Sequence, residues 1–136
     1  MYRRILVPIA DDDGARTDGA LEVARALMTP DAQIVLFHVI EAVPSYIAAQ
    51  IPPDATRRVR EEVSRMMEDV AGRAGPGVEV EIETGHGGRT IVERARADYV
   101  DCIVISSHRP EMRDVLFGST AAYVVRHAPC AVHVLR

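Results

Sequence analysis

The sequence contains no lysine and no tryptophan, and all sixteen of its basic residues are arginine. The absence of lysine excludes a P-loop lysine, a Schiff-base lysine and a lysine general base. Cysteine is also scarce: the two copies, Cys102 and Cys130, lie in apolar surroundings. We expect both to be reduced core thiols rather than a disulfide or a redox pair.

The sequence has no apolar run near the ~18 residues that a membrane span requires, so we expect no membrane insertion. Its formal net charge is −4, which gives no basic field to attract nucleic acid. The first residues, 1–4, lead directly into an apolar strand without the core of a signal peptide. We therefore expect a cytoplasmic protein that does not bind nucleic acid.

Hydrophobic residues make up 48% of the 136 positions, which fits one globular domain. Short apolar runs predict strands at 5–7, 34–39, 78–83, 102–105 and 131–135, and amphipathic helical patterns lie between them. The fourth of these runs is a continuous apolar stretch, which is typical of a buried central strand, whereas the third alternates strictly between valine or isoleucine and glutamate, which is typical of an edge strand. The order βαβαβαβαβ predicts a single α/β domain, an open parallel sheet with helices on both faces.

Several local features predict where the helices begin and how they pack. Thr17 or Asp18 is expected to cap the first helix, and Asp54 the second. The long connection 41–53 contains several apolar residues, so it is expected to pack against the body. The last helix is expected to begin at Gly118-Ser119 and to turn Ala121, Val124 and Val125 inward.

In an open α/β sheet, ligands bind beyond the carboxyl ends of the strands, where the strand order reverses. The candidate loops are therefore 8–14, 39–41 and 106–119. The helix start at Gly118-Ser119 can present N–H groups to a phosphate or can simply be capped. His108, Arg109 and Arg113 can add positive charge over a phosphate or lie in a solvated loop.

Other candidates favour a structural role. The run 11–13 of three aspartates can bind Mg²⁺, but a solvated acidic turn before a helix is favoured. His38 ends a buried strand and is interpreted as a hydrogen-bonded core histidine. The glycine-rich stretch 85–88 lacks the G-x-G-x-x-G spacing and is interpreted as a turn. No catalytic constellation stands out, and a phosphoacceptor receiver domain is disfavoured because its lysine is absent. The residues alone indicate one α/β domain with a possible site for a phosphate-containing ligand.

The chain resembles the universal stress protein family over its whole length, residues 1–136. The resemblance rests on RILVPI at 4–9, HVI at 38–40, SHRP at 107–110, LFGSTAA at 116–122 and VRHAPC at 125–130. It is similar to a subgroup of small bacterial members that carry SHRP and GS-x-AA-x-VVRHA. The resemblance implies a Rossmann-like five-stranded parallel sheet in the order 3-2-1-4-5. It also implies a homodimer that pairs through the last strand, at Val132, Val134 and Leu135.

Many members of the family bind ATP or AMP through a pattern G-x-x-G, nine residues, G-S/T. Gly118-Ser119 match its end, whereas the earlier glycines are replaced in the stretch 106–109, and Ala10 stands where an aspartate is usual. By resemblance Val39 contacts adenine, residues 8–11 contact adenine and ribose, and residues 106–120 hold the phosphates. The implied binding residues are Pro8, Ile9, Ala10, Asp11, Val39, Ile105, Ser106, Ser107, His108, Arg109, Gly118, Ser119 and Thr120.

The resemblance implies a stress-response regulatory protein that binds adenine nucleotide, ATP or AMP, with or without Mg²⁺. Little or no catalytic turnover is expected, with weak ATP hydrolysis or autophosphorylation at most. The replaced glycines and Ala10 motivate an alternative, a nucleotide-free dimeric module of the same fold that regulates a transporter or enzyme partner.

Overall fold

The computed structural model describes residues 1–10, 14–107 and 118–136, and within them it contains a five-stranded parallel sheet. The strands are β1 (Tyr2–Pro8), β2 (Met28–Glu41), β3 (Val78–Gly85), β4 (Cys102–Ser106) and β5 (Ala131–Leu135). The helices are α1 (Gly14–Leu27), α2 (Ser45–Ala48), α3 (Pro53–Ala74), α4 (Gly87–Ala97) and α5 (Ser119–His127). The order β3-β2-β1-β4-β5 confirms the predicted 3-2-1-4-5 topology.

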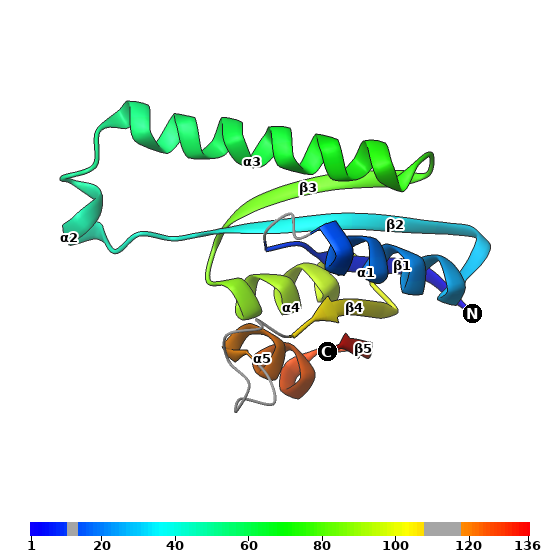
Figure 1. Cartoon of the computed structure of the whole chain (residues 1–136). Helices are drawn as coiled ribbons and strands as arrows, with labels where there is room; N and C mark the ends of the chain where they lie inside the picture. Colours follow the sequence, from blue (N-terminus) through cyan, green and yellow to red (C-terminus); the bar gives the residue numbers. More distant parts are fainter. Residues whose placement is uncertain (11–13, 108–117) are drawn as a thin grey trace.

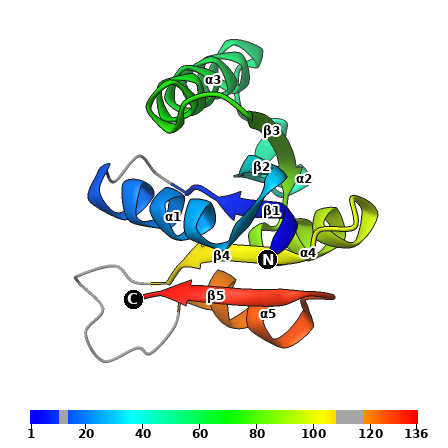
Figure 2. The ribbon, with the colours of Figure 1, turned by 90° about the vertical axis from the view of Figure 1, so that its right-hand side faces the viewer.

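Two helical layers cover the sheet, with α1 and α3 on one face and α4 and α5 on the other (Figures 1 and 2). The central strand β1 sends Ile5 and Val7 into the first layer and Leu6 into the second, and all three are fully buried. This is why its sequence is a continuous apolar run rather than an alternating one. Both cysteines are free: Cys102 is a buried core thiol, as predicted, whereas Cys130 is half-buried and packs against the core.

The two edges of the sheet are β3 and β5. β3 pairs only with β2, which confirms the predicted edge strand, and its adjacent residues Glu79 and Val80 are both exposed. β5 pairs only with β4, so one side of its backbone has no strand partner within the described chain. Among the described residues, no helix combines the length and apolarity needed to cross a membrane.

Three predicted helix details were wrong. α1 begins at Gly14, so Thr17 is a buried residue inside the helix rather than its cap. α3 begins at Pro53, because proline suits the first helical position, and Asp54 lies in the first turn instead of capping it. Val125 on α5 is 45% exposed and does not share the buried face of that helix.

The second strand is longer than predicted, because it begins at Met28, directly after α1. Its register with β1 shifts between the pairs Tyr2–Met28 and Arg4–Gln33. Pro30 falls within this irregular stretch, where a proline can be accommodated without breaking regular ladder hydrogen bonds.

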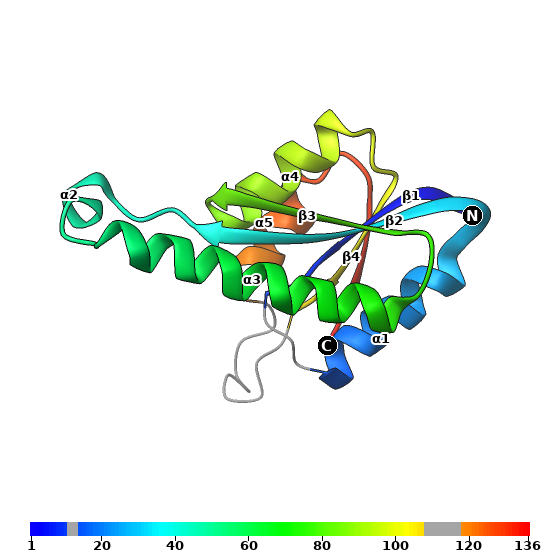
Figure 3. The same cartoon turned by 90° about the horizontal axis from the view of Figure 1, so that it is seen from above.

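The prediction that the connection 41–53 packs against the body was also wrong. Residues 41–50 are all exposed, with Tyr46 at 75% and Ile47 at 40%. The end of β2, the short α2 and the start of α3 extend beyond the rest of the sheet (Figures 1 and 3). The apolar side chains of this extension have no facing layer to pack against.

Candidate functional site at the carboxyl edge

The strand order reverses between β1 and β4, which lie side by side although β2 follows β1 in the chain. The helices that follow these two strands, α1 and α5, lie on opposite faces of the sheet (Figure 2). This is the position where open α/β sheets bind ligands. The structure thus brings together the described parts of the predicted loops.

The loop after β1 is fixed by the neighbouring strand β2. Ile9 is buried, and its N–H donates to the Phe37 carbonyl over 2.8 Å. Its carbonyl lies 2.6 Å from Nδ1 of His38, and since a carbonyl only accepts, the proton lies on Nδ1. His38 is therefore hydrogen-bonded, as predicted, but it is half-buried and not part of the core. Ala10 is exposed at the edge, whereas the predicted ligand Asp11 lies outside the described residues.

Ser107 holds both ends of the loop after β4. The residue is 8% exposed, and its N–H and hydroxyl donate to the Leu135 carbonyl over 2.9 and 3.2 Å. Its own carbonyl accepts from the Gly118 N–H at 3.2 Å. The chain therefore leaves β4 and enters α5 at one point. The predicted residues His108 and Arg109, and Arg113, lie outside the described residues.

α5 starts as predicted, with an exposed first turn. Gly118 is its N-cap, with φ −64° and ψ 159°, and Ser119 and Thr120 are exposed. The Gly118 carbonyl accepts from the Ala122 N–H at 2.9 Å. Within the described chain no side chain caps this end of the helix. Open N–H groups and the positive end of the helix dipole suit a phosphate at this point.

Two of the other predicted ligands belong to the hydrophobic layer beneath α4 and α5. Ile105 is 4% exposed and lies in that core, and Val39 packs against it while remaining half-buried. Ser106 and Pro8, at the ends of their strands, are half-buried as well. Val39 therefore offers apolar surface close to the edge, whereas the Ile105 side chain is committed to the core.

The N-terminus of α4 lies beside that of α5, but a carboxylate occupies it. Oε1 of Glu41 accepts from the Gly87 N–H at 2.9 Å, and Nδ1 of His86 lies 4.0 Å from Oε2. A methyl group on Gly87 would also lie 3.4 Å from the Thr120 hydroxyl oxygen, which shows how close the two helix starts are. The sequence analysis predicted that residues 39–41 form a loop at the site. It did not predict that Glu41 binds the start of α4, because the only sign in the sequence is a carboxylate at the end of a strand.

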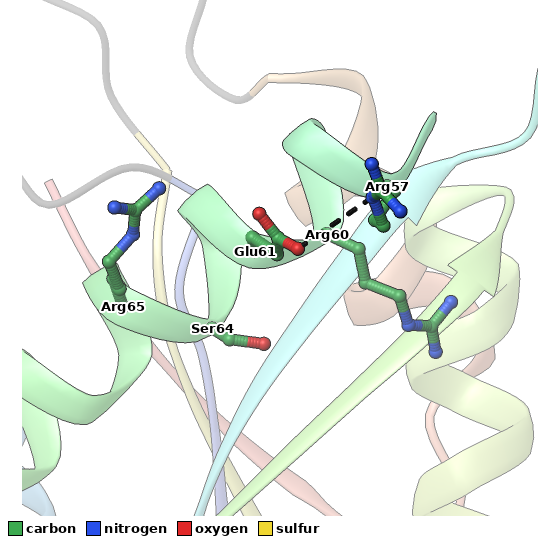
Figure 4. Close-up of a pocket in the computed structure, with 5 residues that line it drawn as sticks. All are labelled: Arg57, Arg60, Glu61, Ser64 and Arg65. Carbon is green, nitrogen blue, oxygen red and sulfur yellow. Dashed lines mark ion pairs between the residues drawn. The ribbon is translucent and has the colours of Figure 1, made fainter. Parts of the chain in front are cut away.

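Sequence reasoning also missed a hollow beside the first half of α3. It measures about 510 Å³, and the described residues that line it are Arg57, Arg60, Glu61, Ser64 and Arg65 (Figure 4). Their spacing of three and four residues places them on one face of the helix. We call this hollow the arginine pocket. Across the described ranges, no group of three or more histidine, cysteine, aspartate or glutamate side chains is arranged to hold a metal ion.

Comparisons with known proteins agree with this architecture. Universal stress protein A homolog 2 of Coxiella burnetii is 29% identical over 139 residues, covering 99% of this chain and 95% of the relative. The structure of the universal stress protein UspA from Lactobacillus plantarum is 26% identical, with a TM-score of 0.73 and coverage of 99% and 98%.

Two further structures contain adenine nucleotides. The universal stress protein from Archaeoglobus fulgidus in complex with dAMP is 18% identical, with a TM-score of 0.67 and coverage of 99% and 98%. An Arabidopsis thaliana member of the family with AMP bound is 20% identical, with a TM-score of 0.64 and coverage of 98% and 90%. At these identities the likeness shows the shared fold. The profile of the universal stress protein family matches residues 1–136, and the chain belongs to this family.

Proposed function

We propose that this chain is a regulatory protein of the stress response that binds adenine nucleotide, ATP or AMP, with little or no catalytic turnover. The observation that carries the proposal is the open N-terminus of α5 at the point where the strand order reverses. The nucleotide-bound relatives from Archaeoglobus fulgidus and Arabidopsis thaliana, which share this fold, support the choice of ligand class.

In this proposal the phosphates bind at Gly118, Ser119 and Thr120, where the backbone N–H groups and two hydroxyls face solvent. Adenine and ribose lie toward Val39 and the loop that begins at Pro8. The ties from Ile9 to β2 and from Ser107 to β5 hold these two walls in place before a ligand arrives. Such preorganisation reduces the ordering cost of binding.

Titration calorimetry with ATP, with AMP and with ATP plus Mg²⁺ tests the proposal. The φ of Gly118 is open to any residue, so Gly118→Val places its bulk at the helix start without backbone strain. We expect the wild type to bind and Gly118→Val to lose most of the affinity. Gly72→Val is the matched control, because that glycine is exposed on α3 with nothing within 4 Å of an added Cβ. Absence of binding by the wild type at millimolar nucleotide would refute the proposal.

We propose further that the protein is a homodimer that pairs through β5. One side of this strand has no strand partner in the described chain, and Val132, Val134 and Leu135 are half-buried along it. An open strand edge pairs readily with its own symmetry mate. Light scattering after gel filtration should give twice the mass of one chain, and a single-chain mass at high concentration would exclude the dimer.

The alternative is a nucleotide-free module that regulates a protein partner. The exposed apolar residues Val43, Tyr46 and Ile47 favour it, since such surfaces often mark interaction sites. Mass spectrometry of the gently purified protein separates the two functions. A co-purified nucleotide would exclude the module.

A further inference from the structure

The arginine pocket has an uneven charge. Three guanidinium groups line it against one carboxylate, in a chain whose formal net charge is −4. Arg57 is paired with Asp54 at 3.4 Å and with Glu61 at 3.9 Å. Arg60 and Arg65 form no ion pair or hydrogen bond with any residue that the structure describes. Their charges are therefore available to a ligand.

The half of α3 that carries the pocket contributes little to the core. The buried residues of this helix are Met67, Val70 and Ala74, all in its second half. The first half, by contrast, is mostly exposed and extends beyond the sheet (Figures 1 and 3). Packing thus explains the second half of α3, whereas the arginines of its first half lie outside the core.

The pocket lies toward the same end of the sheet as the candidate nucleotide site, the end where the strands have their carboxyl termini. α3 enters β3 through a short turn and runs antiparallel to it, so the start of the helix lies toward the carboxyl ends of the strands. The hollow of about 510 Å³ is open to solvent, and its described lining comes from one face of α3, so it suits a charged group bound at the surface. Ser64 adds a hydroxyl to the same helix face, between Arg60 and Arg65 in the sequence, while the guanidinium groups of these two arginines point in different directions (Figure 4).

We propose that the arginine pocket binds phosphate groups, with Arg60 and Arg65 as the direct ligands. A guanidinium presents paired N–H donors that match two phosphate oxygens, and its charge is retained at every physiological pH. Arg57, held by Asp54 and Glu61, contributes charge to the wall. The phosphate has two sources of the same chemistry: a nucleotide that places its phosphates at α3 instead of at the start of α5, or a separate phosphorylated ligand.

Calorimetry with inorganic tripolyphosphate at low and moderate salt tests the phosphate site directly. We expect R60Q and R65Q each to weaken binding about tenfold, because each removes one charge-assisted contact. R58Q is the matched control: it makes the same change on the same helix, but Arg58 does not line the pocket, and its affinity should stay within about twofold of the wild type. Equal affinity in R60Q, R65Q and R58Q, or no tripolyphosphate binding by the wild type, would overturn the proposal.

A second arm with ATP and adenosine identifies the source of the phosphate. If R60Q weakens ATP binding and leaves adenosine binding unchanged, the pocket holds the phosphate chain of the nucleotide. If R60Q weakens only tripolyphosphate binding, the pocket takes a separate ligand, and the phosphate site still stands. This inference does not depend on the proposed nucleotide binding. A wild type that binds tripolyphosphate but not ATP refutes the nucleotide proposal alone, and the reverse result refutes the arginine pocket alone.

Discussion

The amino end and the carboxyl end of the sheet differ in whether their polar groups have partners within the protein. At the amino end, the Asp101 carboxylate accepts from the N–H groups of Arg3 and Arg4 at 2.8 and 3.0 Å. Asp98 lies 3.7 Å from the Arg4 guanidinium and 3.5 Å from that of Arg94. Most charged groups at this end pair with one another, although the buried Nε of Arg4 has no hydrogen-bond partner among the described residues, so this end mainly holds the fold together.

At the carboxyl end, the starts of α4 and α5 lie side by side, and only one of them is occupied. Glu41 places a carboxylate on the Gly87 N–H, whereas no described side chain caps α5. A carboxylate at a helix start satisfies the dipole and repels a second anion. The glycines at 85–88 therefore form the turn into α4, as predicted, and the proposed phosphate site lies at α5. In this proposal, stability and binding depend on opposite ends of the sheet, and this division can be tested.

The largest expected effect on the free energy of unfolding comes from a substitution that pushes α4 and α5 apart. A Cβ on Gly88 would lie 2.9 Å from the Cβ of Tyr123, so α4 and α5 pack directly against each other there. We expect Gly88→Val to lower the free energy of unfolding by about 3 kcal/mol, because the overlap can be relieved only by moving a helix. Gly72→Val, which has open space around it, should change that free energy by less than about 1 kcal/mol. Equal stability of the two variants in urea denaturation would contradict the close packing.

The second prediction separates the two ends of the sheet. Asp101→Ala leaves the N–H groups of Arg3 and Arg4 without their acceptor, and we expect a loss of about 2–3 kcal/mol in the free energy of unfolding. ATP affinity should not change, because the deletion lies at the end opposite the site. The exposed Asp31→Ala is the control for a lost surface charge. A fall in ATP affinity for the folded Asp101→Ala variant would break the division between the ends.

The third prediction concerns pH at the amino end. Burial, followed by the nearby Cys130 and Asp101, raises the pKa of Cys102 from 9.0 to about 11. The folded state keeps a proton that the unfolded chain loses, so this contribution to stability is complete below pH 9 and is lost as the pH rises toward 11.

The measurement is urea denaturation of the wild type and of Cys102→Ala from pH 8 upward. We expect the wild type to lose about 2 kcal/mol more than the variant across this interval. Cys130→Ala should remove a smaller part of the fall, because burial raises the pKa of that half-buried thiol as well. Parallel curves for the wild type and Cys102→Ala would show that the thiol is not the titrating group.

The sequence predicted the regular parts of this molecule because each was encoded by adjacent residues. The apolar run Ile5 to Val7 and the alternation from Val78 onward each set one strand, and Gly118 marked the start of α5. What was missed depended on the surroundings. The apolar Tyr46 predicts burial only if another layer faces it, and the extension beyond the sheet has none.

The missed parts of the site have the same origin. Glu41 accepts a hydrogen bond from Gly87, which lies 46 residues further along the chain. A pattern of neighbouring residues cannot indicate a contact between residues so far apart in the sequence. The arginine pocket arises because α3 extends past the sheet, which its helical pattern does not show. Predictions at Asp11, His108 and Arg109 lie outside the described residues and stay predictions.

The smallest expected effect tests why α4 does not bind phosphate. Glu41→Gln keeps a carbonyl oxygen for the Gly87 N–H and removes only the charge, so the free energy of unfolding should fall by about 0.3–1 kcal/mol. Because the Glu41 carboxylate and Thr120 both border Gly87, the same change removes a repulsive charge beside the proposed phosphate site. We expect ATP affinity to rise about two- to fivefold, more at low salt, while adenosine affinity stays constant.

Glu62→Gln, which changes an exposed carboxylate on α3 outside the arginine pocket, controls for the change in net charge. If both variants gain the same ATP affinity, the effect is one of overall charge, and the carboxylate on α4 does not decide which of the two helix starts takes the phosphate.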